Sequence, residues 1–316
     1  MQQFGRSNPF YYGCGRDSII ATTALVATAG VAAADVTLNG WAALGVVQGK
    51  GIYGDSTARI ENNVELFIVG STETDAGVSL KATVLLENND GADYAASVTP
   101  DASTLVEVGF GGLNLAFGNT DGAADRVTGE TPRLYPGIRF EGWGGHVDNT
   151  DANPVFRAEY TFGDVLVAAS YAGEDEQYGI GARYTISGVT VGLAYEDAAT
   201  GANTNDLWNV SASYTMDNLT VSAIHWRSDN DAGVENRNQT DIGVQYKMGA
   251  ITVAAEYLMN DFAGTDNYTV WGSYDLGGGA YVFGQLGTRD YSATVSGTGA
   301  ALNEEGFASA GIRFAF

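Results

Sequence analysis

The chain has two histidines, His146 and His225, which are the first side chains to consider for acid–base chemistry. A hydrolase would need such a histidine beside a serine nucleophile and an acidic partner. His225 follows an alternating apolar run beside Trp226, and His146 lies in the glycine-rich stretch WGGHVDN. No G-x-S-x-G or H-E-x-x-H motif is present. We therefore expect no catalytic residues and no enzymatic activity.

Two oxygen-rich stretches are the other candidates for a binding site, in this case for a metal ion. NNDGAD (88–93) and SDNDAG (228–233) could bind Ca²⁺ in external loops, but Asp and Asn are equally ordinary turn formers. The single cysteine, Cys14, excludes a disulfide framework. We expect no resident cofactor, with Ca²⁺ in the loops as an open alternative.

The charge balance limits the partners of this protein. Its 316 residues carry 38 acids against 15 Lys and Arg, a net charge of −23. Nucleic acid needs a basic surface and is therefore not an expected partner. After the N-terminal region no apolar run approaches the roughly 20 residues that a membrane helix needs. A membrane barrel stays open, since its strands are only half apolar.

The N-terminal region has the pattern of a secretory signal. Residues 19–34, IIATTALVATAGVAAA, are apolar and small, and Ala32-x-Ala34 suits a cleavage site. The preceding residues contain only Arg6 and Arg16 as positive charges, which is atypical. We therefore divide the chain into 1–34, an atypical extension plus signal peptide, and 35–316, a β-barrel. A short buried helix at 19–31 is the alternative.

From residue 35 onward, alternating runs are joined by short turns, which is the pattern of β-hairpins. PVFRAEYTF, Gly163-Asp164 and VLVAASYAG form one example, and YGIGARYTI, Ser187-Gly188 and VTVGLAYE form another. The connections between hairpins are longer, and the longest is 119–153. Counting the runs predicts an all-β, 16-stranded antiparallel transmembrane barrel with both termini at the short-turn end. A Greek-key sandwich would not keep this alternation of short and long connections.

Aromatic side chains indicate which face meets lipid. Tyr178 and Tyr184 bracket one apolar stretch, and the pairs Trp208 with Tyr214 and Tyr268 with Tyr274 bracket two more. Each pair lies six residues apart on one strand face, as the two aromatic girdles of a lipid-embedded barrel would. The opposite faces are polar, which predicts a wet interior. By the same alternation the terminal GIRFAF faces lipid with Ile312, Phe314 and Phe316.

Taken together, ATTALVATAGVAAADVTLNG, NPVFRAEYTFGDVLVAASYAG, SYDLGGGAYVFG and the terminal GIRFAF resemble the general porins of Gram-negative bacteria, in particular the Rhodobacter type. The resemblance implies a homotrimer in the outer membrane, in contact with its lipid and lipopolysaccharide, that passes small hydrophilic solutes by passive diffusion. It also implies that the barrel-assembly machinery reads the terminal aromatic residue, here Phe316.

In that family the third external loop folds into the barrel, and its acids oppose a basic wall. The matching loop here is 119–153. The resemblance therefore implies a constriction with loop acids Asp121, Asp125, Glu130 and Glu141 and wall bases Arg59, Lys81, Arg157 and Arg183. Alternation also turns several acids inward, which thins the basic wall and favours cations: Glu61, Glu65, Glu107, Glu159 and Glu196. Alternatively, these charges are ordinary solvated residues of the lumen or loop.

Two other functions stay open. A substrate-selective channel, for a sugar or an organic ion, would need an aromatic slide along the lumen. The inward aromatic candidates are expected on distant strands: Trp41, Trp226, Trp271, Tyr281 and Phe283. A structural or adhesive outer-membrane barrel would need long working loops, and most of these loops are short.

Overall fold

The computed structural model describes residues 34–49, 56–89, 101–129, 131, 154–173, 177–198, 205–230, 235–261, 264–291 and 303–316. The proposed signal segment (apart from Ala34), Glu130, Glu141, His146, and residues 90–93 and 231–233 of the two Ca²⁺ candidate stretches lie outside these residues. The predictions made for them stay predictions.

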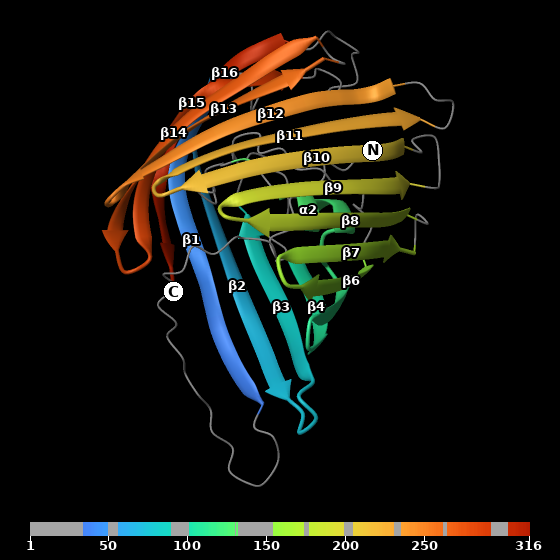
Figure 1. Cartoon of the computed structure of the whole chain (residues 1–316). Helices are drawn as coiled ribbons and strands as arrows, with labels where there is room; N and C mark the ends of the chain where they lie inside the picture. The colour runs from blue at the N-terminus through green and yellow to red at the C-terminus, as the bar shows by residue number, and fades with distance from the viewer. Residues whose placement is uncertain are drawn as a thin grey trace.

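Sixteen antiparallel strands form one closed barrel, as the sequence pattern predicts (Figure 1). The first eight are β1 (Asp35–Gly49), β2 (Arg59–Glu73), β3 (Ser79–Asn89), β4 (Asp101–Phe110), β5 (Leu113–Gly118), β6 (Val155–Phe162), β7 (Val165–Ala172) and β8 (Gln177–Ile186). The others are β9 (Val189–Ala198), β10 (Asn205–Met216), β11 (Leu219–Asn230), β12 (Glu235–Met248), β13 (Ile251–Asn260), β14 (Thr265–Gly277), β15 (Ala280–Tyr291) and β16 (Asn303–Ala315). The helix α2 (Ala123–Thr128) lies between β5 and β6.

Every strand pairs with its neighbour in the chain, and the ring is closed by β1 and β16. This seam runs from Trp41 opposite Ala315 to Gly49 opposite Phe307. Beyond it, Gly40 and Phe316 exchange two backbone hydrogen bonds of 2.8 and 2.9 Å. The last residue of the chain therefore completes the ladder as well as contributing an aromatic ring.

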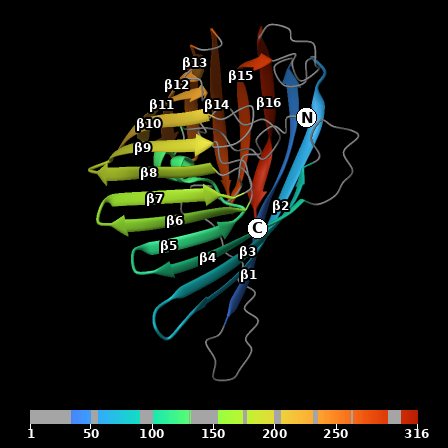
Figure 2. The ribbon, with the colours of Figure 1, turned by 90° about the vertical axis from the view of Figure 1, so that its right-hand side faces the viewer.

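Short turns lie at one end of the barrel (Figure 2). Ser187 and Gly188 have φ values of 49° and 82°, so this turn uses the left-handed region that glycine adopts readily. Asp217 likewise has a φ of 50° in the next turn. Because β1 begins and β16 ends at the short-turn end, the predicted placement of the two termini is confirmed.

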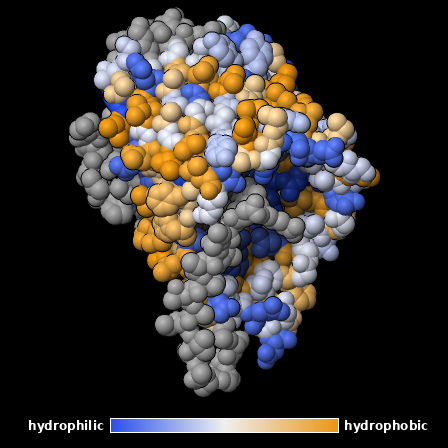
Figure 3. All heavy atoms as spheres, turned by 90° about the vertical axis from the view of Figure 1, so that its left-hand side faces the viewer, coloured by the Kyte–Doolittle hydropathy of each residue, from blue (hydrophilic) through white to orange (hydrophobic). Residues whose placement is uncertain are grey.

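The alternation of the strands separates two surfaces. All six bracketing aromatics are exposed on the outside, with between 44% (Tyr184) and 54% (Trp208) of each side chain accessible. Figure 3 shows hydrophobic residues gathered over the middle of one outer face. His225 also points outward, where its Nδ1 lies 2.9 Å from Thr240 Oγ1. In the described residues, no helix has the length and apolar character needed to cross a membrane.

Candidate functional site: the inner wall of the barrel

The four predicted wall bases all occupy inward positions, but they do not form one row. Lys81 makes a salt bridge of 2.6 Å to Glu107 on the neighbouring strand. Across β3, β4, β5 and β6, the directly opposite residues are Lys81, Glu107, Ala116 and Arg157 in that order. Arg157 is therefore three strands from Lys81. Arg59 is distant from Lys81. The residue of β2 opposite Lys81 is Ser71, and Ser71 lies 71 − 59 = 12 residues beyond Arg59 on that strand. At the usual strand rise this is roughly 40 Å.

The described part of the 119–153 loop lies against the inner wall. Helix α2 packs on β7, β8, β9 and β10. Ala123, Ala124 and Val127 form a buried apolar cluster with inward residues of β7 and β9, Leu166, Ala168 and Ala194. Backbone N–H groups at the start of the helix donate to Ser170 Oγ (from Ala123, 2.8 Å) and Glu196 Oε1 (from Ala124, 3.2 Å). Apolar packing and hydrogen bonds therefore both hold the helix against the barrel wall.

Inward glycines make this close approach possible. A Cβ atom on Gly181 would lie 2.4 Å from Val127 Cγ2, and one on Gly192 would lie 2.4 Å from the Val127 carbonyl oxygen. Real Cβ atoms do not tolerate such distances, so a side chain at either position would push the helix away from the wall. These two positions thus form a smooth surface that seats the helix.

A buried ionic network ties the loop to β6. Arg157 Nε donates to Glu159 Oε1 at 2.7 Å, and Arg126 of the helix donates to Glu159 Oε2 at 2.8 Å. Arg157 Nη1 also donates to Thr120 Oγ1 at 2.7 Å and to the backbone oxygen of Asp121. With only 1% of its side chain exposed, Arg157 is committed to these contacts. Its observed role is to hold the start of the loop.

The other contacts of the loop place the remaining predicted residues. Arg183 Nη1 donates to the backbone oxygen of Arg126 at 3.3 Å, so Arg157 and Arg183 both contact the described part of the loop. The acids Asp121 and Asp125 are buried, at 2% and 6% exposure. The structure thus brings two of the four bases and two of the four acids to one part of the wall.

Sequence reasoning missed one contact site of the loop. Thr131 Oγ1 lies 2.6 Å from Asp241 Oδ2 on β12 and 3.3 Å from Glu256 Oε1 on β13. Both acids are buried, at 0% and 4% exposure. Strand alternation could have placed the two carboxylates inside the barrel, but no local pattern indicates that a threonine 110 residues away would reach Asp241.

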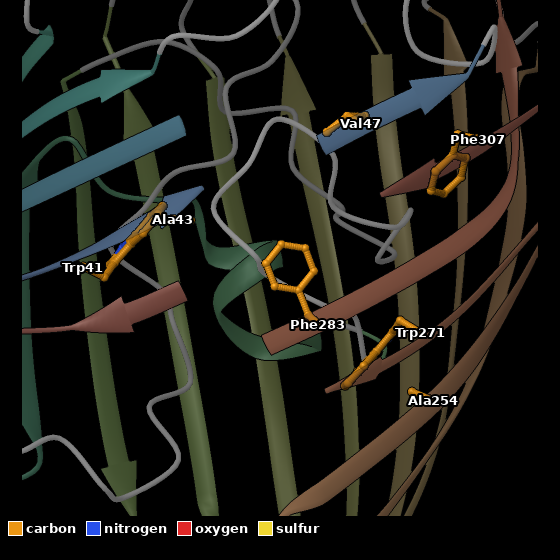
Figure 4. Close-up of a cluster of buried hydrophobic side chains, with 7 residues drawn as sticks. All are labelled: Trp41, Ala43, Val47, Ala254, Trp271, Phe283 and Phe307. Atoms are coloured by element: carbon orange, nitrogen blue, oxygen red, sulfur yellow. The ribbon is translucent and has the colours of Figure 1, made fainter. Parts of the chain in front are cut away.

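The expectation that the inward aromatics lie on distant strands is wrong for most of them. Barrel closure places β1 beside β16, so one buried cluster contains Trp41, Ala43, Val47, Ala254, Trp271, Phe283 and Phe307 (Figure 4). Tyr281 packs against it, and Trp226 lies in a separate cluster with Leu207, Ile224 and Leu258. The members of the first cluster are at most 6% exposed. An aromatic slide needs exposed ring faces, so this cluster does not provide one.

The interior is strongly acidic at its buried positions. Among the described residues, eight acids but only one base are buried: Glu61, Glu65, Asp121, Asp125, Glu159, Glu196, Asp241 and Glu256 against Arg157. No group of three or more His, Cys, Asp or Glu side chains in this part of the chain could hold a metal ion. A polar wall with an excess of acids suits the passage of charged or polar solutes.

Comparisons with known proteins agree with this geometry. Residues 21–294 match the sequence model of a family described as Gram-negative porin. A porin of Fuscovulum blasticum is 26% identical over 292 residues, covering 84% of this chain and 98% of that protein. A porin of Rhodobacter capsulatus is 25% identical over 89% of this chain and all of that protein. A solved mutant of Rh. blastica porin shares the fold with a TM-score of 0.69 at 24% identity, over 89% of this chain and all of that one.

The helix seat is tested by adding a methyl group to it. Gly192→Ala should displace α2, because the new Cβ would meet the Val127 carbonyl oxygen and the Thr128 Cα. We expect amide hydrogen exchange of residues 119–129 to accelerate by roughly tenfold or more, since overpacking a close contact costs about 1–3 kcal/mol. Gly272→Ala on β14 is the matched control, because its Cβ would meet nothing closer than 3.7 Å. Equal exchange in both variants would contradict the seat.

Proposed function

The chain belongs to the Gram-negative porin family, and from this premise we propose that its channel prefers cations. As a member of that family it is an outer-membrane protein whose barrel forms a water-filled channel for passive diffusion of small hydrophilic solutes and ions. Members of the family act as channels, and we assign no catalysis to this one. The cation preference is the part that rests on the residues of this chain.

One observation carries the proposal of cation preference, namely the excess of buried acids over buried bases inside the barrel. A wall that carries net negative charge attracts cations and repels anions through the field that it projects into the lumen. Low-dielectric walls focus that field along the channel. The single buried base, Arg157, does little to oppose it because Glu159 neutralises it at 2.7 Å.

We further propose that the segment 119–153 narrows the channel as a whole, and that Asp121, Asp125, Glu130 and Glu141 bear on the ion path. Support comes from α2, which already occupies the inner wall at β7–β10. Arg183 lies beside the loop through its contact with Arg126 and is the wall base best placed to moderate the acidic field. Arg59 and Lys81 remain proposed members of the basic wall.

A homotrimer is the proposed assembly. Every described tyrosine or tryptophan that faces outward lies on β6–β14: Tyr160, Tyr171, Tyr178, Tyr184, Tyr195, Trp208, Tyr214, Tyr246, Tyr257, Tyr268 and Tyr274. Across β15, β16 and β1–β5 the described outward residues include neither type. Tyr and Trp gather where protein meets the lipid interface, so the sector without them suits contact with other subunits.

Other partners remain proposals from the family. Outer-membrane lipid and lipopolysaccharide would surround the girdled sector. Ca²⁺ in the external loops is retained as a proposal only, since residues 90–93 and 231–233 of the two oxygen-rich stretches lie outside the described residues.

Ion selectivity is tested by removing the loop acids. Converting Asp121, Asp125, Glu130 and Glu141 to amides should shift the zero-current potential in a KCl gradient toward anion permeation. The cation-to-anion permeability ratio should fall by roughly two- to tenfold, the scale on which focused charge changes local ion concentration. The control variant converts the outward acids Asp197, Asp206, Asp229 and Asp266 to amides. It removes the same charge outside the lumen and should lower the permeability ratio less. An anion-selective wild type would refute the proposal.

The terminal residue is expected to matter more for assembly than for stability. Phe316 is 46% exposed, so its burial contributes only about 1–2 kcal/mol even though its backbone pairs with Gly40. Deleting Phe316 should leave the protein in the periplasm, unassembled, as measured by membrane fractionation. Phe316→Ala removes the aromatic ring but keeps the backbone pairing with Gly40, so it distinguishes the contribution of the ring from that of the backbone hydrogen bonds. Wild-type surface levels in both variants would exclude the assembly role.

The proposed subunit face is tested by placing charge on it. Leu44→Lys lies in the sector without a girdle, and Val210→Lys is its control on β10; the side chains are 52% and 43% exposed in the single chain. Charge buried in a subunit contact is strongly unfavourable, so Leu44→Lys should convert trimers to monomers in mass measurements on detergent-solubilised protein. Val210→Lys should retain the trimer. The reverse pattern would place the interface elsewhere.

A further inference from the structure

One row of inward residues crosses five strands beneath the loop. Arg183, Gly192, Ser211, Ile224 and Asp241 lie directly opposite one another in order from β8 to β12. Glu256 on β13 lies beside the far end of this row, diagonal to Asp241. The row is therefore a track along the inner wall, with a base at one end and two acids at the other.

The loop follows this track residue by residue. Arg183 donates to the Arg126 carbonyl at 3.3 Å. The Thr128 Cα would lie 3.0 Å from a Cβ on Gly192. Three residues later, the Thr131 hydroxyl reaches Asp241 at 2.6 Å.

The chain can span this path. Gly192 and Asp241 are three strand positions apart, which is roughly 14 Å along the wall. Three residues reach at most about 11 Å between their Cα atoms, and the side chains of Thr131 and Asp241 supply the remaining reach. The Thr131 hydroxyl is therefore the point at which the chain after α2 contacts the far end of the track.

We propose that Asp241 and Glu256 are positioning residues that hold Thr131 at the end of this track and thereby keep the acid-bearing segment 121–131 against the wall. The Thr131 hydroxyl donates to one carboxylate, and the second carboxylate lies within 3.3 Å of the same oxygen. Such bonds to charged acceptors are stronger than neutral ones, especially when buried. The pair holds the end of the segment that follows Asp125, whereas Arg157 holds its start at Asp121. Because this segment carries the loop acids, the proposal rests on the proposed function.

Release of the loop is measured by the reactivity of a buried position. Val127 lies on the wall-facing side of α2 and is fully buried. We therefore introduce Val127→Cys, with Cys14→Ser to remove the lone native thiol, and follow its modification by a water-soluble methanethiosulfonate. Thr131→Val deletes the hydroxyl at nearly constant shape and should raise the modification rate by roughly tenfold or more, as expected from loss of a hydrogen bond to a charged group. Thr131→Ser keeps the donor and should leave the rate near that of the wild type.

The acids are tested with a charge-matched control. The pair Asp241→Asn and Glu256→Gln should raise the Val127→Cys modification rate, and in single-channel recordings it should increase the fluctuations of the open-channel current. The pair Glu61→Gln and Glu65→Gln removes the same two charges from buried inward positions of β2. It should change ion selectivity but leave the Val127→Cys rate unaltered.

Three outcomes would overturn the positioning role. They are an unchanged rate in Thr131→Val, an equal rise in Thr131→Ser, and an equal rise in the Glu61 and Glu65 control pair. Heat-dependent mobility on denaturing gels confirms that each variant retains a folded barrel. The proposed function is tested independently of the positioning role. An anion-selective wild type would contradict cation preference but would not change the conclusion from the thiol measurements.

Discussion

Complete pairing of backbone polar groups is the constraint on which the rest of this structure depends. An open strand edge in hydrocarbon would leave N–H and C=O groups unsatisfied, at a cost of several kcal/mol each. The chain meets this constraint with fifteen pairings between consecutive strands and a seam between β1 and β16. Even Gly40 and Phe316, beyond the last paired strand residues, exchange backbone bonds. Closure thus extends to the end of the chain.

Closure also decides which residues meet inside. Trp41 and Phe307 are 266 positions apart in sequence, since 307 − 41 = 266, yet they share one buried cluster because β1 and β16 are neighbours. The ring of Phe283 in the same cluster lies over Gly311, where a Cβ would come within 2.7 Å of it. Small residues on the seam thereby make room for the aromatic side chains of adjacent strands. A period-of-two pattern gives the direction of each side chain, but only the closed order of strands gives its neighbours.

The same distinction explains how much could be predicted from the sequence. Strand number, turn positions, the lipid-facing aromatics and the inward direction of Arg157, Arg183 and Glu196 follow from local alternation and turn residues, and the structure has all of them. Contacts between the loop and the wall do not follow, because they depend on the stagger of strands far apart in sequence. Lys81 illustrates this limit: alternation turns it inward, but its register places it beside Glu107 at 2.6 Å and three strands from Arg157.

The interior also shows why inward charge and available charge differ. Arg157 is the base that alternation would place most directly against the loop acids, yet its donors are taken by Glu159, Thr120 and a backbone oxygen. A guanidinium buried to 1% exposure is retained in a fold only with such complete pairing. The residue that anchors the loop is therefore poorly placed to offer net positive charge to a passing ion. Glu159 in turn bridges Arg157 and Arg126, so the acid and both bases form one structural unit. The inward direction of a base therefore does not by itself give the charge that the wall presents to the lumen.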